Sequence, residues 1–120
     1  MKILVADDSR VMRQIVVRAL RQAGYGHCEI VEAVDGQDAL MKVHTEDPDL
    51  ILSDWNMPRM TGLDLLASLR ATGDRRPFGF VTSDATAPIR STAERAGAQF
   101  LIAKPFTSEA LAESLAPLLG

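Results

Sequence analysis

The sequence lacks several features that mark particular classes of protein. It contains one cysteine, Cys28, in 120 residues, so no disulfide can form within the chain, and a reducing cytoplasm is the expected location. No apolar run is long enough to span a bilayer, and the N-terminal run at residues 3–6 is too short for a signal peptide. A positive net charge is also missing. The net charge of −3 argues against general binding to nucleic acid or to anionic membranes.

What remains is the composition of an ordinary folded protein. Apolar residues make up 47% of the chain and charged residues 24%, and 120 residues suffice to bury a core without disulfides or metals. We find no internal repeat, low-complexity tract or linker. We therefore expect one domain that spans residues 1–120.

Short apolar runs predict five β-strands, at residues 1–6, 28–33, 50–53, 78–81 and 100–103. The run at 28–33 partly alternates polar and apolar residues, which favours a strand at the edge of a sheet. Gly79 weakens the fourth run and indicates close packing of a neighbouring group.

Segments with helical spacing separate these runs. The first begins after Ser9, a predicted N-cap, and ends at Gly24; its arginines are expected to form mainly a solvated face. Pro117 lies within the last predicted helix and is expected to kink or stop it. The other helices are predicted after Asp35-Gly36, at 62–70, from Pro88 to Gly97, and from Thr107 or Ser108 onward.

Alternation of five strands with five helices predicts an α/β fold, with a parallel sheet covered by helices on both faces. Right-handed crossovers leave few topologies. An edge strand at the second position fits the doubly wound, flavodoxin-like order 2-1-3-4-5, a three-layer α/β/α arrangement.

Parallel strands all end at one edge of the sheet, and polar residues follow four of the predicted strands there: Asp7 and Asp8, Asp54, Thr82 and Lys104. Ligands of such sheets bind outside the carboxyl ends, where the strand order reverses. In the predicted order this point lies between the first and third strands, so Asp7, Asp8 and Asp54 flank it.

Three carboxylates in one crevice repel one another and need a counter-charge. A Mg²⁺ ion held by carboxylates, waters and a phosphate oxygen would supply it. Lys104 adds a point charge suited to a phosphate, and the Thr82 hydroxyl adds a hydrogen-bond donor. These groups favour phosphoryl transfer, in which Asp54 can act as the nucleophile and form an acyl phosphate.

The motifs cover the whole chain: Asp7-Asp8, the segment Ser53-Asp54-Trp55-Asn56-Met57-Pro58 with Gly62 after it, Thr82, and Lys104-Pro105-Phe106. Together they resemble the receiver domain of two-component response regulators, and the segment around Asp54 particularly resembles that of stand-alone chemotaxis regulators. One aspartate pair would be weak evidence, whereas these positions in order, each at a strand end, form a specific pattern.

The resemblance implies that Asp54 accepts a phosphoryl group from a phosphohistidine on a sensor kinase or phosphotransfer protein. It implies that Asp8, Asp54 and the backbone carbonyl of Asn56 bind Mg²⁺ directly, while Asp7 acts largely through water. Lys104 would pair with the phosphoryl group. Phosphorylation would change binding to a protein target such as a flagellar motor component, and the chain would act as a monomer and not as an enzyme on an outside metabolite.

The resemblance also assigns residues to switching and to the lifetime of the phosphorylated state. Thr82 would move to hydrogen-bond the phosphoryl group, Lys104-Pro105 would be a cis peptide, and Asn56 and Asp84 would tune hydrolysis. In the family an aromatic residue usually stands three residues before the lysine. Here Leu101 occupies that position and the aromatic is Phe100, so either a local irregularity restores Phe100 or the aromatic switch is missing. Alignment without a gap favours Leu101.

Other functions stay open at this point. The chain could be a phosphate sink or shuttle without its own target, or an N-terminal receiver domain trimmed from a longer regulator. An aspartate-nucleophile phosphohydrolase usually carries a second acid two residues after the nucleophile, where this chain has Asn56. A flavin binder would need a Gly- and hydroxyl-rich phosphate loop in place of Asp7-Asp8.

Overall fold

The structure is a computed structural model that describes residues 1–119. Its elements alternate as predicted: β1 (Lys2–Ala6), α1 (Arg10–Leu20), a π-helical turn η1 (Arg21–Tyr25), β2 (Glu29–Ala33), α2 (Gly36–Glu46), β3 (Leu50–Ser53), α3 (Gly62–Ala71), β4 (Phe78–Thr82), α4 (Ala87–Ala96), β5 (Phe100–Ala103) and α5 (Ser108–Leu119). Within residues 1–119, no helix is long and apolar enough to cross a membrane.

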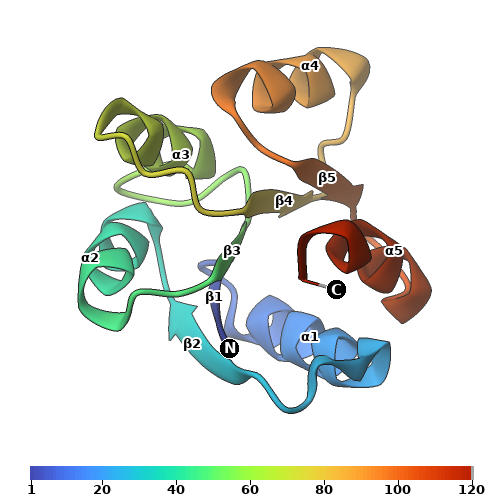
Figure 1. Ribbon diagram of the computed structural model, residues 1–120. Helices are drawn as coiled ribbons and strands as arrows, with labels where there is room; N and C mark the ends of the chain where they lie inside the picture. Colours follow the sequence, from blue (N-terminus) through green and yellow to red (C-terminus); the bar gives the residue numbers. More distant parts are fainter. Residues whose placement is uncertain (120) are drawn as a thin grey trace.

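The strands form one parallel five-stranded sheet in the order β2-β1-β3-β4-β5, which confirms the predicted fold class. Figure 1 shows the layers: α1 and α5 cover one face of the sheet, and α2, α3 and α4 cover the other. β2 lies at an edge, as its partly alternating sequence predicted. The central strands β1, β3 and β4 are buried on both faces, which explains their nearly continuous apolar runs.

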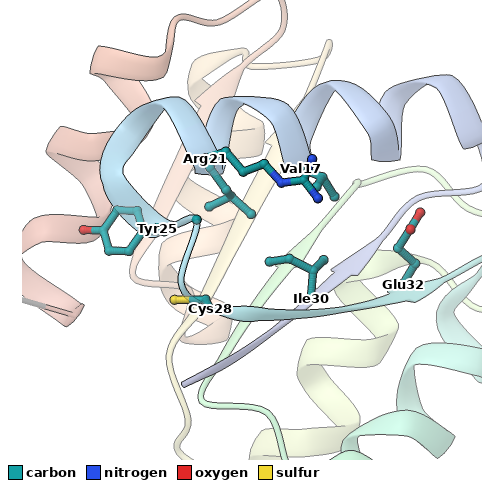
Figure 2. Close-up of a pocket in the computed structure, with 8 residues that line it drawn as sticks. Val17, Arg21, Tyr25, Cys28, Ile30 and Glu32 are labelled. Atoms are coloured by element: carbon teal, nitrogen blue, oxygen red, sulfur yellow. The ribbon is translucent and has the colours of Figure 1, made fainter.

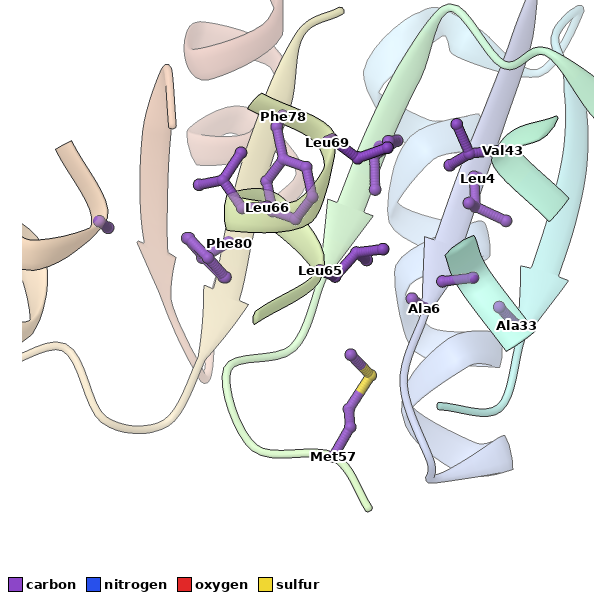
Figure 3. Packing of buried hydrophobic residues seen from close by; sticks show 13 residues of the cluster. Leu4, Ala6, Ala33, Val43, Met57, Leu65, Leu66, Leu69, Phe78 and Phe80 are labelled. Carbon is purple, nitrogen blue, oxygen red and sulfur yellow. The ribbon is translucent and has the colours of Figure 1, made fainter. Parts of the chain in front are cut away.

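Two hydrophobic clusters hold the helices on the sheet. Between the sheet and α2, α3 and α4, the fully buried Phe78 and Phe80 pack with the leucines of α3 (Figure 3). On the other face, Ile3, Leu50 and Leu52 pack against residues of α1 and α5. Since each fully buried large apolar side chain contributes roughly 1.5–3 kcal/mol, these clusters position the loops at the carboxyl edge firmly.

Side-chain caps begin most of the helices. The Ser9 hydroxyl accepts the Met12 N–H, and the Thr107 hydroxyl accepts the Ala110 N–H, so Thr107 rather than Ser108 caps α5. Gly24 has a φ of 101° in η1, a left-handed conformation that favours glycine and ends the helical path near the predicted point. Helix α5 includes Pro117 and extends to Leu119, so the helix does not stop before the proline.

Neighbouring residues of β5 face opposite sides of the sheet. Phe100 packs in the cluster beneath α1 and α5, whereas Leu101 packs in the cluster beneath α2, α3 and α4. Gly79, the strand partner of Phe100, makes room for its ring, since a Cβ at Gly79 would lie 2.1 Å from ring atoms of Phe100. The close packing predicted at Gly79 is therefore present, and no irregularity brings Phe100 to the face that Leu101 occupies.

Candidate functional site

Three carboxylates meet at the carboxyl edge of the sheet. Asp7 and Asp8 follow β1 and Asp54 follows β3; these strands are neighbours, and the Asp54 N–H donates to the Ala6 carbonyl over 2.9 Å. One oxygen from each carboxylate lies within 4.8 Å of the others. The cluster forms where the strand order reverses, as the predicted topology required.

The carboxylate of Asp7 is buried, and each of its two oxygens has a hydrogen-bond partner. One of its oxygens accepts the Ser9 N–H over 2.8 Å, and the other lies 3.1 Å from the Lys104 Nζ. Only 4% of Asp7 is exposed, whereas Asp8 is exposed. Asp7 therefore connects the loop after β1 to Lys104, and the carboxylate of Asp8 is accessible to a ligand from solvent.

Asp54 lies between these neighbours with 14% of its side chain exposed. Its Oδ1 accepts the Trp55 N–H over 2.7 Å, and its Oδ2 lies 3.5 Å from the Lys104 Nζ. Burial raises the pKa of Asp54 above its ordinary value; the Lys104 charge opposes this rise, and the Asp7 charge adds to it. The carboxylate at the centre of the cluster is thus destabilised in its charged form, which is common at functional sites.

Lys104 and Thr82 reach the same edge from β5 and β4. The Lys104 N–H donates to the Thr82 carbonyl over 2.8 Å, which joins the two strand ends. Lys104-Pro105 is a cis peptide, as expected from the resemblance. The Thr82 hydroxyl is buried and accepts the Asp84 N–H over 3.1 Å. Asn56 and Asp84 are both exposed in the loops after β3 and β4.

The loop after Asp54 is held close to the strand end. A Cβ at Gly62 would lie 2.1 Å from the Asp54 carbonyl oxygen, so only glycine fits at the start of α3. Arg59 adopts a left-handed backbone conformation with φ 66° and donates to Asp35 over 2.6 Å. The Gly36 N–H donates to the Met60 carbonyl, which ties the same loop to the start of α2.

One residue beside the site was missed by the sequence interpretation. The arginines of α1 were expected to form mainly a solvated face, and this is wrong for Arg13, whose side chain is 11% exposed. Its guanidinium donates to the Asp7 carbonyl over 2.7 Å and to Glu32 over 2.9 Å. The signal in the sequence was only its position four residues after the Ser9 cap, which is too weak to identify such a contact.

A separate hollow of about 250 Å³ lies between α1, η1 and β2. Figure 2 shows Val17 and Arg21 from the helical side facing Ile30 and Glu32 of β2, with Cys28 at its base. None of the predicted site residues lines it.

Residues 3–116 match the response regulator receiver domain family. The chain belongs to this family. CheY-like receiver domains are signalling switches of two-component phosphorelays, so the acid cluster lies in a protein of that class.

Similar proteins include chemotaxis regulators along their whole length. The chain is 40% identical over 119 residues to the chemotaxis protein CheY of Pseudomonas aeruginosa, covering 96% of this chain and 93% of that protein. It is 40% identical over 117 residues to CheY-3 of Vibrio cholerae, covering 96% and 88%. The solved structure of Vibrio cholerae CheY4 superposes with a TM-score of 0.85 at 34% identity, covering 98% of each chain.

Receiver domains typically use Mg²⁺ at an acidic pocket, and the donors present in this receiver domain fit such an ion. Asp7, Asp8 and Asp54 offer hard carboxylate oxygens, which Mg²⁺ prefers. Their three negative charges face one lysine charge at Lys104, so the cluster retains an excess of negative charge that a divalent cation would offset.

Proposed function

We propose that this receiver domain is a phosphorylation-driven switch in which Asp54 accepts a phosphoryl group from a phosphohistidine of a sensor kinase or phosphotransfer protein. One observation carries the proposal: the half-buried Asp54 carboxylate lies within 4.8 Å of two further acids, with the Lys104 ammonium 3.5 Å from its Oδ2. The Lys104 ammonium, together with a divalent cation held by the acids, would offset the negative charge of an incoming phosphoryl group.

In the proposed transfer an Asp54 oxygen forms a bond to phosphorus while the bond from phosphorus to the histidine nitrogen breaks. The nitrogen keeps the electron pair, and Asp54 carries an acyl phosphate. Lys104 orients the phosphoryl oxygens and offsets their charge, and Asp7 positions Lys104 through its 3.1 Å contact. Mg²⁺ held by Asp8, Asp54 and the Asn56 carbonyl, with Asp7 acting through water, would supply further positive charge.

Switching is proposed to involve Thr82 and Leu101. The Thr82 hydroxyl accepts the Asp84 N–H, which leaves its own hydrogen to donate when Thr82 moves toward a phosphoryl group. Leu101 lies on the face of the sheet covered by α4 and could follow this movement, whereas Phe100 lies on the opposite face. Asn56 and Asp84, which are exposed in the loops after β3 and β4, are proposed to tune the lifetime of the phosphorylated state.

The output is proposed to be altered binding to a protein target. Several relatives are named as chemotaxis proteins, which supports a target of the flagellar motor type. The reaction is confined to the phosphorylation and dephosphorylation of this chain. A single receiver domain over residues 1–120, a monomeric state and a cytoplasmic location stay predictions.

A phosphate sink is a second candidate function. Leu101 stands where an aromatic residue was expected, and Phe100 is committed to the other side of the sheet by its packing against Gly79. A chain without an aromatic switch could remove phosphoryl groups from a kinase without signalling to a target of its own.

The experiment is incubation with Mg²⁺ and acetyl phosphate, followed by intact mass measurement. We expect one added phosphoryl group in the native chain and none in Asp54→Asn. An adduct of equal extent in Asp54→Asn, or turnover of a free phosphate ester without any adduct, would contradict the proposal.

A further inference from the structure

At the amino end of the sheet, a hollow of about 360 Å³ lies between the C-terminal ends of α3 and α4. Its lining includes three arginines, Arg70, Arg75 and Arg95, together with Gln99. We propose that this hollow, called here the arginine hollow, binds a small ligand that carries a pyrophosphate group. The proposal is independent of the phosphorylation proposed at Asp54, because the hollow lies at the opposite end of the strands.

Arg70 is held in place by backbone groups. Its guanidinium donates to the Asp74 carbonyl over 3.0 Å and to the Gly97 carbonyl over 2.8 Å. Gly97 has a φ of 102°, and a Cβ there would lie 2.9 Å from the Arg70 Nε, so the glycine makes room for the arginine. Neutral carbonyl oxygens fix the direction of the guanidinium without removing its charge.

The nearest acid, Asp74, offsets the charge of the arginine hollow only in part. Asp74 directs both carboxylate oxygens to Arg76, at 2.9 and 3.0 Å, and Arg76 is shared with Asp47. Among residues 1–119, no aspartate or glutamate lines the hollow. Burial and the neighbouring Arg75 charge lower the pKa of Arg70, and the Asp74 charge opposes this shift in part.

A simpler explanation accounts for only part of this arrangement. Arg70 and Arg95 lie in the last turns of α3 and α4, where positive side chains stabilise a helix. That explanation does not include Arg75, an exposed residue of the loop after α3 whose guanidinium donates to the Arg70 carbonyl over 3.3 Å. A third guanidinium thus lies beside the two at the helix ends, and its charge acts on Arg70.

The chemistry of the lining favours a pyrophosphate over other anions. Arginine forks bind phosphate oxygens in pairs, and three such charges exceed what one phosphate requires. Gln99 uses its carbonyl oxygen to accept the Phe78 N–H, so its amide group remains as a donor. A hollow of about 360 Å³ matches a small molecule rather than a protein segment.

The test is calorimetric titration with inorganic pyrophosphate in EDTA, so that no metal bridges the ligand to the acid cluster. The double variant Arg75→Gln/Arg95→Gln should bind at least about tenfold more weakly, since two charged hydrogen-bonding groups are lost. The matched control Arg10→Gln/Arg18→Gln removes the same charge from exposed positions of α1 and should leave the affinity unchanged. Orthophosphate should bind more weakly than pyrophosphate.

A second readout locates the ligand. In amide NMR spectra, pyrophosphate should shift the signals of Gly73, Gly97 and Gln99 and leave those of Asp8 and Trp55 in place. Equal weakening in both double variants would overturn the proposal, as would the lack of saturable pyrophosphate binding. Stronger binding of a hexaglutamate peptide than of pyrophosphate would also overturn it, because it would indicate a protein partner.

Discussion

Asp35 and Asp54 follow the two strands that flank β1, and their surroundings shift their pKa values in opposite directions. Asp35, after β2, accepts the Asp38 N–H over 2.7 Å and the Arg59 guanidinium over 2.6 Å. These hydrogen bonds lower the pKa of Asp35, and the bond from the Asp38 N–H contributes most. Asp54, after β3, has its pKa raised by burial and lies among like charges.

The difference separates a structural acid from the acid that we propose to be functional. Asp35 caps α2 and anchors the loop that follows Asp54, so its charge stabilises the fold. Burial and the Asp7 charge make the charged form of Asp54 unfavourable, and in the proposed function a bound cation would offset this cost. Both look alike in the sequence, as an aspartate after a short strand.

The largest expected effect concerns Lys104. Lys104→Ala removes the ammonium that lies 3.5 Å from the Asp54 Oδ2, and phosphorylation by acetyl phosphate should slow by roughly 100-fold. The rate is measured by intact mass at successive times. The control Lys42→Ala removes a lysine that contacts Asp38 and the Glu32 carbonyl and should have little effect. Equal rates in both variants would remove Lys104 from the proposed mechanism.

The second prediction concerns the exposed acid of the cluster. Asp8→Asn removes a hard anionic ligand, and the apparent Kd for Mg²⁺ should rise by about tenfold or more. Titration of Trp55 fluorescence measures this, because Trp55 follows Asp54 and donates its N–H to it. Asp47→Asn, at the amino end of the sheet and 90% exposed, is the matched control and should leave the Kd unchanged.

The third prediction compares the two acids directly by urea unfolding in EDTA at neutral pH. Asp35→Ala should destabilise the fold by about 1–2 kcal/mol through loss of the α2 cap. Asp54→Asn should instead stabilise the metal-free protein by about 1 kcal/mol, because it removes one of three clustered like charges. Loss of stability in Asp54→Asn would contradict the comparison.

The smallest effect is the pH dependence of Asp35. Its folded pKa lies below its unfolded value, so its contribution is present above about pH 4 and is lost as pH falls through the lowered folded pKa. Asp35→Asn keeps a capping oxygen but loses the charge. The native chain should exceed this variant in stability by less than about 1 kcal/mol near neutral pH, and the difference should vanish in acid. Urea unfolding across this range checks the sign.

The fold and the acid cluster were predictable because local signals sufficed for them. Short apolar runs mark buried strands, and parallel strands place Asp7, Asp54 and Lys104 at one edge whatever the details of packing. Gly79 likewise indicated a close neighbour, and the two-residue period of a strand separated Phe100 from Leu101.

The features that were not predictable depend on contacts between distant segments. Arg13 turns inward because Glu32 of the edge strand lies beside it, and helical spacing alone cannot show this. The Asp35–Arg59 pair joins two loops, and the arginine hollow joins two helices and a connecting loop. Long charged side chains have no periodic signal that states which neighbour they will find.

The most direct test of the central claim is to locate the phosphoryl group itself. After incubation with Mg²⁺ and acetyl phosphate, borohydride reduces an acyl phosphate of aspartate to homoserine, and peptide mass spectrometry identifies the changed residue. We predict homoserine at position 54 alone. Homoserine at position 7 or 8, or no reduced residue in a phosphorylated sample, would contradict the role of Asp54.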